Sequence, residues 1–109
     1  MSLKIDYIEF SRPEFAASQH FFEQAFGWQS VDYGPDYQEL QQAGIGAGMA
    51  RAPSAAPLIV LKSEDLEAAQ AQVMQAGGRI TKAIFAFPGG RRFEFLEPSG
   101  AAMAVWSEH

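Results

Sequence analysis

The sequence of 109 residues contains no cysteine. This absence excludes disulfides, zinc sites with cysteine ligands, iron–sulfur clusters and thiol nucleophiles. Basic residues are also few: eight Lys and Arg stand against 13 Asp and Glu, and only Arg91 and Arg92 are adjacent. A net charge of −5 with scattered basic residues argues against nucleic acid as a partner, because phosphate binding needs clustered Lys and Arg.

Long hydrophobic runs are absent as well. No apolar run approaches the roughly 20 residues that span a bilayer, and the first residues lack the apolar stretch of a signal peptide. We therefore expect no membrane partner and a cytoplasmic location. The length predicts a single domain over residues 1–109, and nine Phe residues argue against a disordered chain.

The two halves of the sequence show the same order of predicted elements. The first half predicts a strand at 4–10, a helix that buries Phe15, Phe22 and Phe26, and strands at 28–33, 37–42 and 45–51. The second half predicts a strand at 58–61, a helix that buries Leu66, Ala69 and Val73, and strands at 79–87, 91–96 and 101–106. This repeat predicts an α+β fold of two βαβββ modules, about 3–51 and 58–107, joined by a linker at 52–57.

The ends of both helices carry local signals. Ser11-Arg12-Pro13-Glu14 has the spacing of a capping box, and Ser63 precedes the second helix, so we expect serine caps at both N-termini. Gly27 follows the first helix, where a left-handed residue commonly ends a helix.

Three stretches occur in a fixed order along the chain: residues 21–28 at the end of the first helix (FFEQAFGW), residues 65–78 ending in Ala-Gly-Gly, and the turn Glu97-Pro98-Ser99-Gly100. This series resembles the vicinal oxygen chelate superfamily, the glyoxalase, bleomycin-resistance and extradiol-dioxygenase group. The resemblance implies that each module curls its sheet into a half-open barrel, that a small-molecule ligand binds in the barrel cavity, and that the chain forms a homodimer.

Catalytic members of this superfamily hold a divalent metal with four His, Glu or Gln side chains from the first and last strands of both modules. Carried over to this sequence, the four positions fall on Tyr7, on Leu58, near Gly48 and near Ala104. None of these side chains is a usual ligand of such an ion. The resemblance with these departures predicts a metal-independent protein with no metal and no other cofactor.

Strand alternation extends the expected cavity lining to Tyr7, Glu9, Met49, Leu58, Val60, Ala104 and Trp106, with Gly48 as the alternative to Met49. Glu9 is the best candidate for a catalytic residue, because a carboxylate in an apolar pocket has a raised pKa and can act as a general acid or base. Alternatively, Glu9 pairs with an Arg or lies at a wet cavity mouth. Tyr7 either donates a hydrogen bond to a substrate oxygen or is a core aromatic.

The facing of the strand at 91–96 is not fixed by its sequence. Arg92 and Glu94 share one side of it and form a solvated ion pair in the simplest interpretation. If an Arg reaches the cavity instead, it would select anionic ligands through a bidentate contact.

Three functions fit these observations. The first is a metal-free protein that binds a small, largely apolar or aromatic molecule, as bleomycin-resistance relatives do. The second is a lyase, isomerase or dioxygenase-like enzyme of the glyoxalase type, with a bound metal or a role for Glu9. The third is a dimeric interaction domain whose cavity is filled by side chains such as Trp106. We expect the first, and the sequence leaves open whether the protein is an enzyme.

Overall fold

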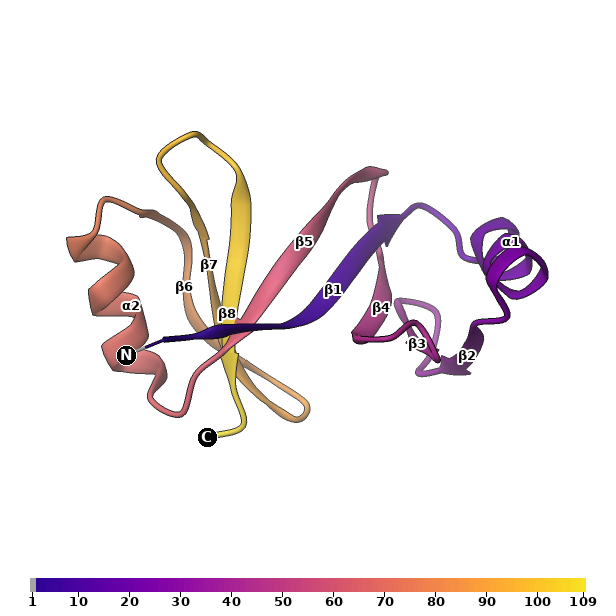
Figure 1. Cartoon of the computed structure of the whole chain (residues 1–109), viewed down its shortest axis with the longest axis horizontal. Helices are drawn as coiled ribbons and strands as arrows, with labels where there is room; N and C mark the ends of the chain where they lie inside the picture. Colours follow the sequence, from indigo (N-terminus) through magenta and orange to yellow (C-terminus); the bar gives the residue numbers. More distant parts are fainter. Residues whose placement is uncertain (1) are drawn as a thin grey trace. The chain divides into compact units, whose positions relative to one another are not determined.

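The computed structural model describes residues 2–109 and divides the chain into two compact units. Unit 1 combines the N-terminal residues through Asp6 with Ile59–His109, and unit 2 is Tyr7–Leu58. Strands β1 (Lys4–Arg12) and β5 (Ala55–Lys62) contribute residues to both units (Figure 1).

Unit 2 holds the first βαβββ set: helix α1 (Ala16–Phe26) and strands β2 (Gln29–Asp32), β3 (Tyr37–Gln41) and β4 (Gly46–Arg51), with β1. The strand order is β2-β3-β4-β1, in which β4 runs parallel to β1 and the other neighbours are antiparallel. Phe22 of α1 packs with Phe10, Leu40, Ala47 and Met49 from the sheet. Helix α1 therefore covers one side of the unit 2 sheet.

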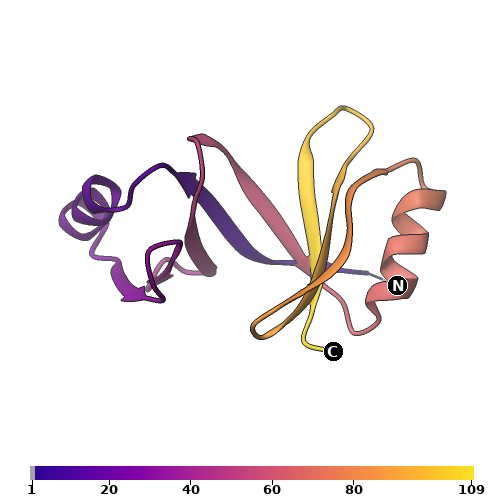
Figure 2. The ribbon, with the colours of Figure 1, turned by 180° about the vertical axis from the view of Figure 1, so that it is seen from behind.

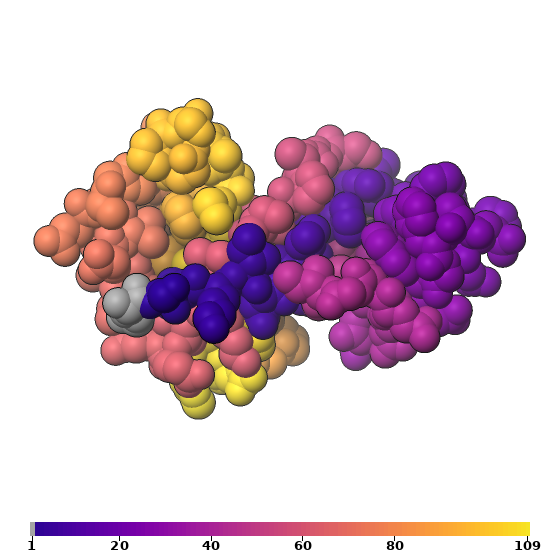
Figure 3. Space-filling view, viewed as in Figure 1, coloured from indigo at the N-terminus to yellow at the C-terminus, as the bar shows by residue number. Residues whose placement is uncertain are grey.

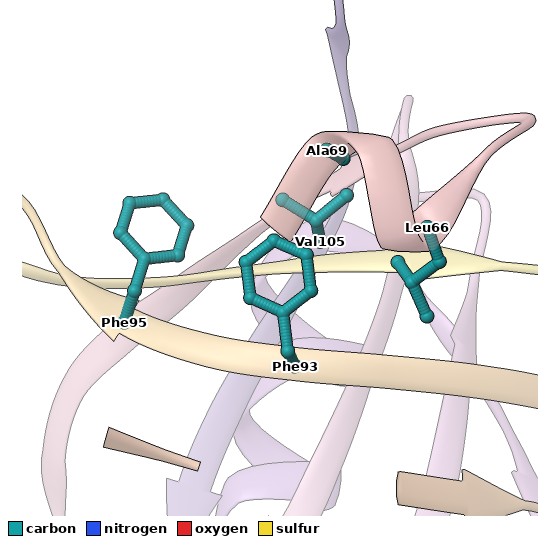
Figure 4. Packing of buried hydrophobic residues seen from close by; sticks show 5 residues of the cluster. All are labelled: Leu66, Ala69, Phe93, Phe95 and Val105. Carbon is teal, nitrogen blue, oxygen red and sulfur yellow. The ribbon is translucent and has the colours of Figure 1, made fainter. Parts of the chain in front are cut away.

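Unit 1 holds the second set: helix α2 (Leu66–Gln75) and strands β6 (Arg79–Phe87), β7 (Gly90–Leu96) and β8 (Ala102–Ser107), with β5. The order is β6-β7-β8-β5, and β5 runs parallel to β8. Helix α2 lies along these strands in both ribbon views (Figure 2). Its Leu66 and Ala69 pack against Phe93, Phe95 and Val105 (Figure 4).

The element order confirms the predicted α+β fold of two βαβββ modules. One boundary differs, because β5 begins at Ala55, inside the predicted linker at 52–57. A residue before proline favours an extended backbone, so Ala56 continues the strand into Pro57. Within residues 2–109, neither helix is long and apolar enough to cross a membrane.

The helix ends agree with the sequence at the C-terminus of α1 and differ at both N-termini. Gly27 ends α1 with a φ of 76°, as predicted. The predicted capping box is wrong: Ser11 belongs to β1, where it pairs with Ala50. Among the described residues, no side chain caps α1. Asp65 rather than Ser63 caps α2, because its carboxylate accepts a hydrogen bond of 3.1 Å from the Ala68 amide.

Candidate functional site

The side of each sheet opposite its own helix carries most of the candidate functional residues. We call this side the helix-free face of the unit. Strand alternation and register define it in unit 2 by Tyr7, Glu9, Tyr37, Glu39 and Gly48. The same criteria define it in unit 1 by Val60, Lys62, Lys82, Phe85, Phe87, Arg92, Glu94, Ala104 and Trp106.

Gly48 lies at the centre of the helix-free face of unit 2. Glu9 and Glu39 are its register partners on the two neighbouring strands. The phenol groups of Tyr7 and Tyr37 are hydrogen-bonded to each other, and a Cβ atom at Gly48 would overlap both phenol oxygens. The absence of a side chain at Gly48 therefore lets the two phenols meet above the strand.

The phenol of Tyr7 is neutral at neutral pH. Burial raises the pKa of its phenol above the ordinary value of 10.0. The hydrogen bond with Tyr37 opposes this increase in pKa, whereas the nearby carboxylates of Glu9 and Glu39 add to it. Tyr7 consequently keeps its proton at neutral pH and can take part in hydrogen bonding as a donor. Glu9 is buried beside it, with 9% of its surface exposed.

A row of alternating aromatic and cationic side chains crosses the helix-free face of unit 1. In register across β6, β7, β8 and β5, the row runs through Phe85, Arg92, Trp106 and Lys62. Lys62 Nζ lies 5.1 Å from the centre of the Trp106 ring, and Arg92 Cζ lies 5.6 Å from the centre of the Phe85 ring. Both distances are within the range of cation–π attraction.

Polar contacts hold this row in place. The indole Nε1 of Trp106 donates a 2.8 Å hydrogen bond to Asp6 Oδ2. Arg92 Nη2 donates to Glu94 Oε2 at 2.8 Å, and their side chains are only 20% and 23% exposed. The predicted Arg92–Glu94 pair is therefore present, but it is partly buried rather than fully solvated.

The residues predicted to line a cavity divide between the units: Tyr7, Glu9, Met49 and Leu58 lie in unit 2, and Val60, Ala104 and Trp106 lie in unit 1. Met49 is fully buried beside Phe22 under α1. It therefore lies on the helix side, and Gly48, its alternative, lies on the helix-free face. In unit 1, Val60 and Ala104 are register partners and are both buried on the helix-free face.

Sequence reasoning missed several polar and aromatic residues of these faces: Asp6, Tyr37, Lys62, Lys82 and Phe85. Their position depends on which strands are neighbours and in what register. The i, i+2 spacing of Tyr37 and Glu39 indicates that the two share a face, but not that this face also carries Tyr7.

Two hollows occur within the units. The first, of about 630 Å³, lies in unit 2 and is lined by Pro13 and residues 51–54. The second, of about 390 Å³, lies in unit 1 and is lined by Ser2, Leu3, Lys4, Asp6 and residues 62–65. In Figure 3 the indigo N-terminal residues lie against salmon-coloured residues of unit 1. Asp6 and Lys62 line this second hollow and also contact Trp106 of the aromatic–cationic row.

The four positions expected to correspond to metal ligands carry none of the side chains that a divalent ion prefers. They hold a phenol at Tyr7, no side chain at Gly48, and hydrocarbon at Leu58 and Ala104. Such an ion needs imidazole or carboxylate donors. Within residues 2–109, no group of three or more His, Cys, Asp and Glu side chains could hold one.

Solved structures with the same fold support this architecture. A superfamily member from Vibrio splendidus 12B01 has a TM-score of 0.72 and 16% identity, covering 97% of this chain and 99% of that protein. Methylmalonyl-CoA epimerase from Mycobacterium tuberculosis has a TM-score of 0.70 and 12% identity, covering 94% and 86%. At identities this low, the TM-scores show that the fold is shared and nothing more.

A third similar structure is the Mn(II)-bound glyoxalase from Novosphingobium aromaticivorans, with a TM-score of 0.72 and 22% identity. The match covers 96% of this chain but only 38% of that protein. A search of curated proteins found no match. The family model of the Glyoxalase/Bleomycin resistance protein/Dioxygenase superfamily matches residues 4–105, and this protein therefore belongs to that superfamily.

Proposed function

We propose that the protein binds a small, largely aromatic molecule without a metal ion, and that the helix-free face of unit 1 supplies the aromatic surface. The observation that carries this proposal is Trp106. Its ring edge is fixed by Asp6 at 2.8 Å, and Phe87 lies 6.4 Å away between ring centres. Aromatic side chains beside a few oriented polar groups are the usual composition of a small-molecule site.

Metal independence is part of the same proposal. It is supported by the chemistry of Tyr7, Gly48, Leu58 and Ala104, which replace nitrogen and carboxylate donors. We expect element analysis of the purified protein to find no stoichiometric divalent metal, and EDTA to leave ligand binding unchanged. A divalent metal bound at one ion per chain would overturn this part.

A thermal-shift panel of small aromatic compounds tests binding. A ligand at 100 times its Kd should stabilise the protein by about 2.7 kcal/mol, which raises the melting temperature by about 10 °C or more. Trp106→Leu should abolish the shift. Trp28→Phe is the matched control, because Trp28 belongs to unit 2, where it packs on Phe22 and Phe26. A panel without any shift would contradict the proposal.

A second candidate is an enzyme that moves a proton, and the burial of Glu9 beside Tyr7 favours it. Such an enzyme would catalyse deuterium exchange at carbon atoms next to a carbonyl group, which NMR detects directly. Glu9→Gln should abolish the exchange, whereas Glu39→Gln should retain it. Equal rates in both variants would exclude Glu9 as the base.

We also propose a homodimer. Phe21 and Phe26 are each 57% exposed although α1 was expected to bury Phe26, and their rings meet edge to face at 5.6 Å. Phe26 is the last residue of α1, and its ring lies against the rings of Phe21, Phe22 and Trp28. Exposed apolar surface of this kind commonly marks an interface. Light scattering should give twice 11.9 kDa, and a mass of 11.9 kDa would contradict the dimer. A cytoplasmic location stays a prediction.

A further inference from the structure

The aromatic–cationic row has an uneven distribution of charge. At the Lys62 end, Lys62 Nζ forms a 2.8 Å ion pair with Glu108. The carboxylate of Asp6 accepts the hydrogen bond of the Trp106 indole at the same end. The hydrogen bond to Glu108 raises the pKa of Lys62, so its ammonium group stays charged and paired. This end of the row therefore holds one cation and two carboxylates.

The Phe85 end of the row holds two cations. Lys82 Nζ lies 5.1 Å and Arg92 Cζ lies 5.6 Å from the centre of the same Phe85 ring. Glu94 is the register partner of Lys82, but its carboxylate binds Arg92. Within residues 2–109, Lys82 has no ion-pair partner. Two cations thus lie against one aromatic ring, and Arg92 already has an ion-pair partner.

The backbone of β6 brings Lys82 to this face. The register with β7 shifts between Lys82 and Phe85, so these residues, three positions apart, both face the side of Arg92 and Glu94. A bulge of this kind redirects side chains at the cost of ladder hydrogen bonds. Ile84, between them, packs on the helix side against the core of unit 1.

We propose that this face selects a planar aromatic molecule that carries a carboxylate. The ring of the ligand would lie against Phe85 and Trp106 of the aromatic–cationic row, and its carboxylate would bind Lys82. This inference rests on the proposed function, because it names the ligand class of the same face. A neutral aromatic ring would gain the apolar contact alone, whereas a carboxylate would add a charge-assisted hydrogen bond to the unpaired ammonium group. A cationic ligand would be repelled by Lys82.

The test uses Trp28→Phe protein, in which Trp106 is the single tryptophan, and three probes: benzoate, benzamide and acetate. We expect benzoate to quench Trp106 fluorescence, and benzamide to bind about tenfold more weakly because it lacks the charge. Acetate, which has no ring, should not bind. Raising the salt concentration should weaken benzoate binding and leave benzamide binding unchanged.

Substitutions test whether Lys82 is the cation that binds the ligand carboxylate. Lys82→Gln should reduce benzoate affinity about tenfold and leave benzamide affinity unchanged. Arg91→Gln is the matched control, because Arg91 lies one residue from Arg92 on the helix side, where it binds Glu67. Circular dichroism checks that both variants fold, and the salt dependence of the unsubstituted protein gives an independent measure of charge.

The outcomes separate the two proposals. Equal binding of benzoate and benzamide, or equal loss in the Lys82 and Arg91 variants, would overturn carboxylate selection and leave aromatic binding intact. Binding of neither benzoate nor benzamide, together with no hit in the wider aromatic panel, would overturn both.

Discussion

Asp6 accepts a hydrogen bond of 2.8 Å from the indole N–H of Trp106, although the two residues are 100 positions apart in the sequence. The contact joins the N-terminal residues to the last strand within unit 1. Leu3 strengthens the connection, because it packs against the core that contains Phe93 and Val105. The N-terminal residues are therefore a structural part of unit 1, and Asp6 among them orients the Trp106 ring.

Removal of this hydrogen bond should be visible in stability and in fluorescence. Asp6→Ala leaves the indole N–H without its acceptor, so we expect the free energy of unfolding to fall by about 1–2 kcal/mol. In the Trp28→Phe background, Trp106 emission should also change. Urea denaturation measures the first effect. Asp36→Ala, in an exposed turn, is the control, and equal losses for the two variants would show that the contact contributes nothing.

Gly48→Ala should destabilise unit 2, because its new methyl group would collide with the phenol oxygens of Tyr7 and Tyr37. Overpacking of this kind costs about 1–3 kcal/mol. The same substitution in a Tyr7→Phe/Tyr37→Phe background should cost less, since both oxygens are then absent. Thermal denaturation of the four proteins gives this coupling, and additive effects would refute the predicted collision.

The phenol of Tyr7 should titrate above the ordinary tyrosine value of 10.0. Subtracting the absorbance titration of Tyr7→Phe from that of the unsubstituted protein isolates this group. Because the Tyr37 hydrogen bond opposes the effect of burial, Tyr37→Phe should raise the pKa of Tyr7 further.

The raised pKa of Tyr7 also determines in which direction stability changes with pH. When the folded state holds a proton more tightly than the unfolded state, its stability is complete below the unfolded pKa and falls as the pH rises through the folded pKa. The Tyr7 contribution should thus be intact below pH 10 and be lost above it. A Tyr7→Phe protein with the same alkaline loss as the unsubstituted protein would contradict this assignment.

The two helix N-termini should respond differently to loss of a short polar side chain. Asp65→Ala removes the cap of α2 and should cost about 1 kcal/mol of unfolding free energy. Ser11→Ala should cost little, because Ser11 is a strand residue and does not cap α1. Guanidinium denaturation measures the free energy of unfolding of both variants. A larger loss for Ser11→Ala than for Asp65→Ala would indicate that Ser11 does cap α1.

Local sequence patterns predicted the elements well where short-range geometry decides them. The period-two alternation of β1 correctly separates Tyr7 and Glu9 from Phe10, because successive side chains of a strand point to opposite sides. Gly27 ends α1 because a left-handed residue is favoured there. The capping box failed because pairing of Ser11 with β4 overrides a local helix signal.

Residue type and spacing were enough to predict the duplicated βαβββ order, the superfamily resemblance and the lack of nitrogen and carboxylate donors at the four positions expected to hold metal ligands. Three other features follow from the folded chain: Gly48 rather than Met49 shares a face with Tyr7, Tyr37 contacts Tyr7, and Asp6 binds Trp106. Each of these contacts requires strand neighbours and their register, which are set by packing across the whole unit and leave no local signal in the chain.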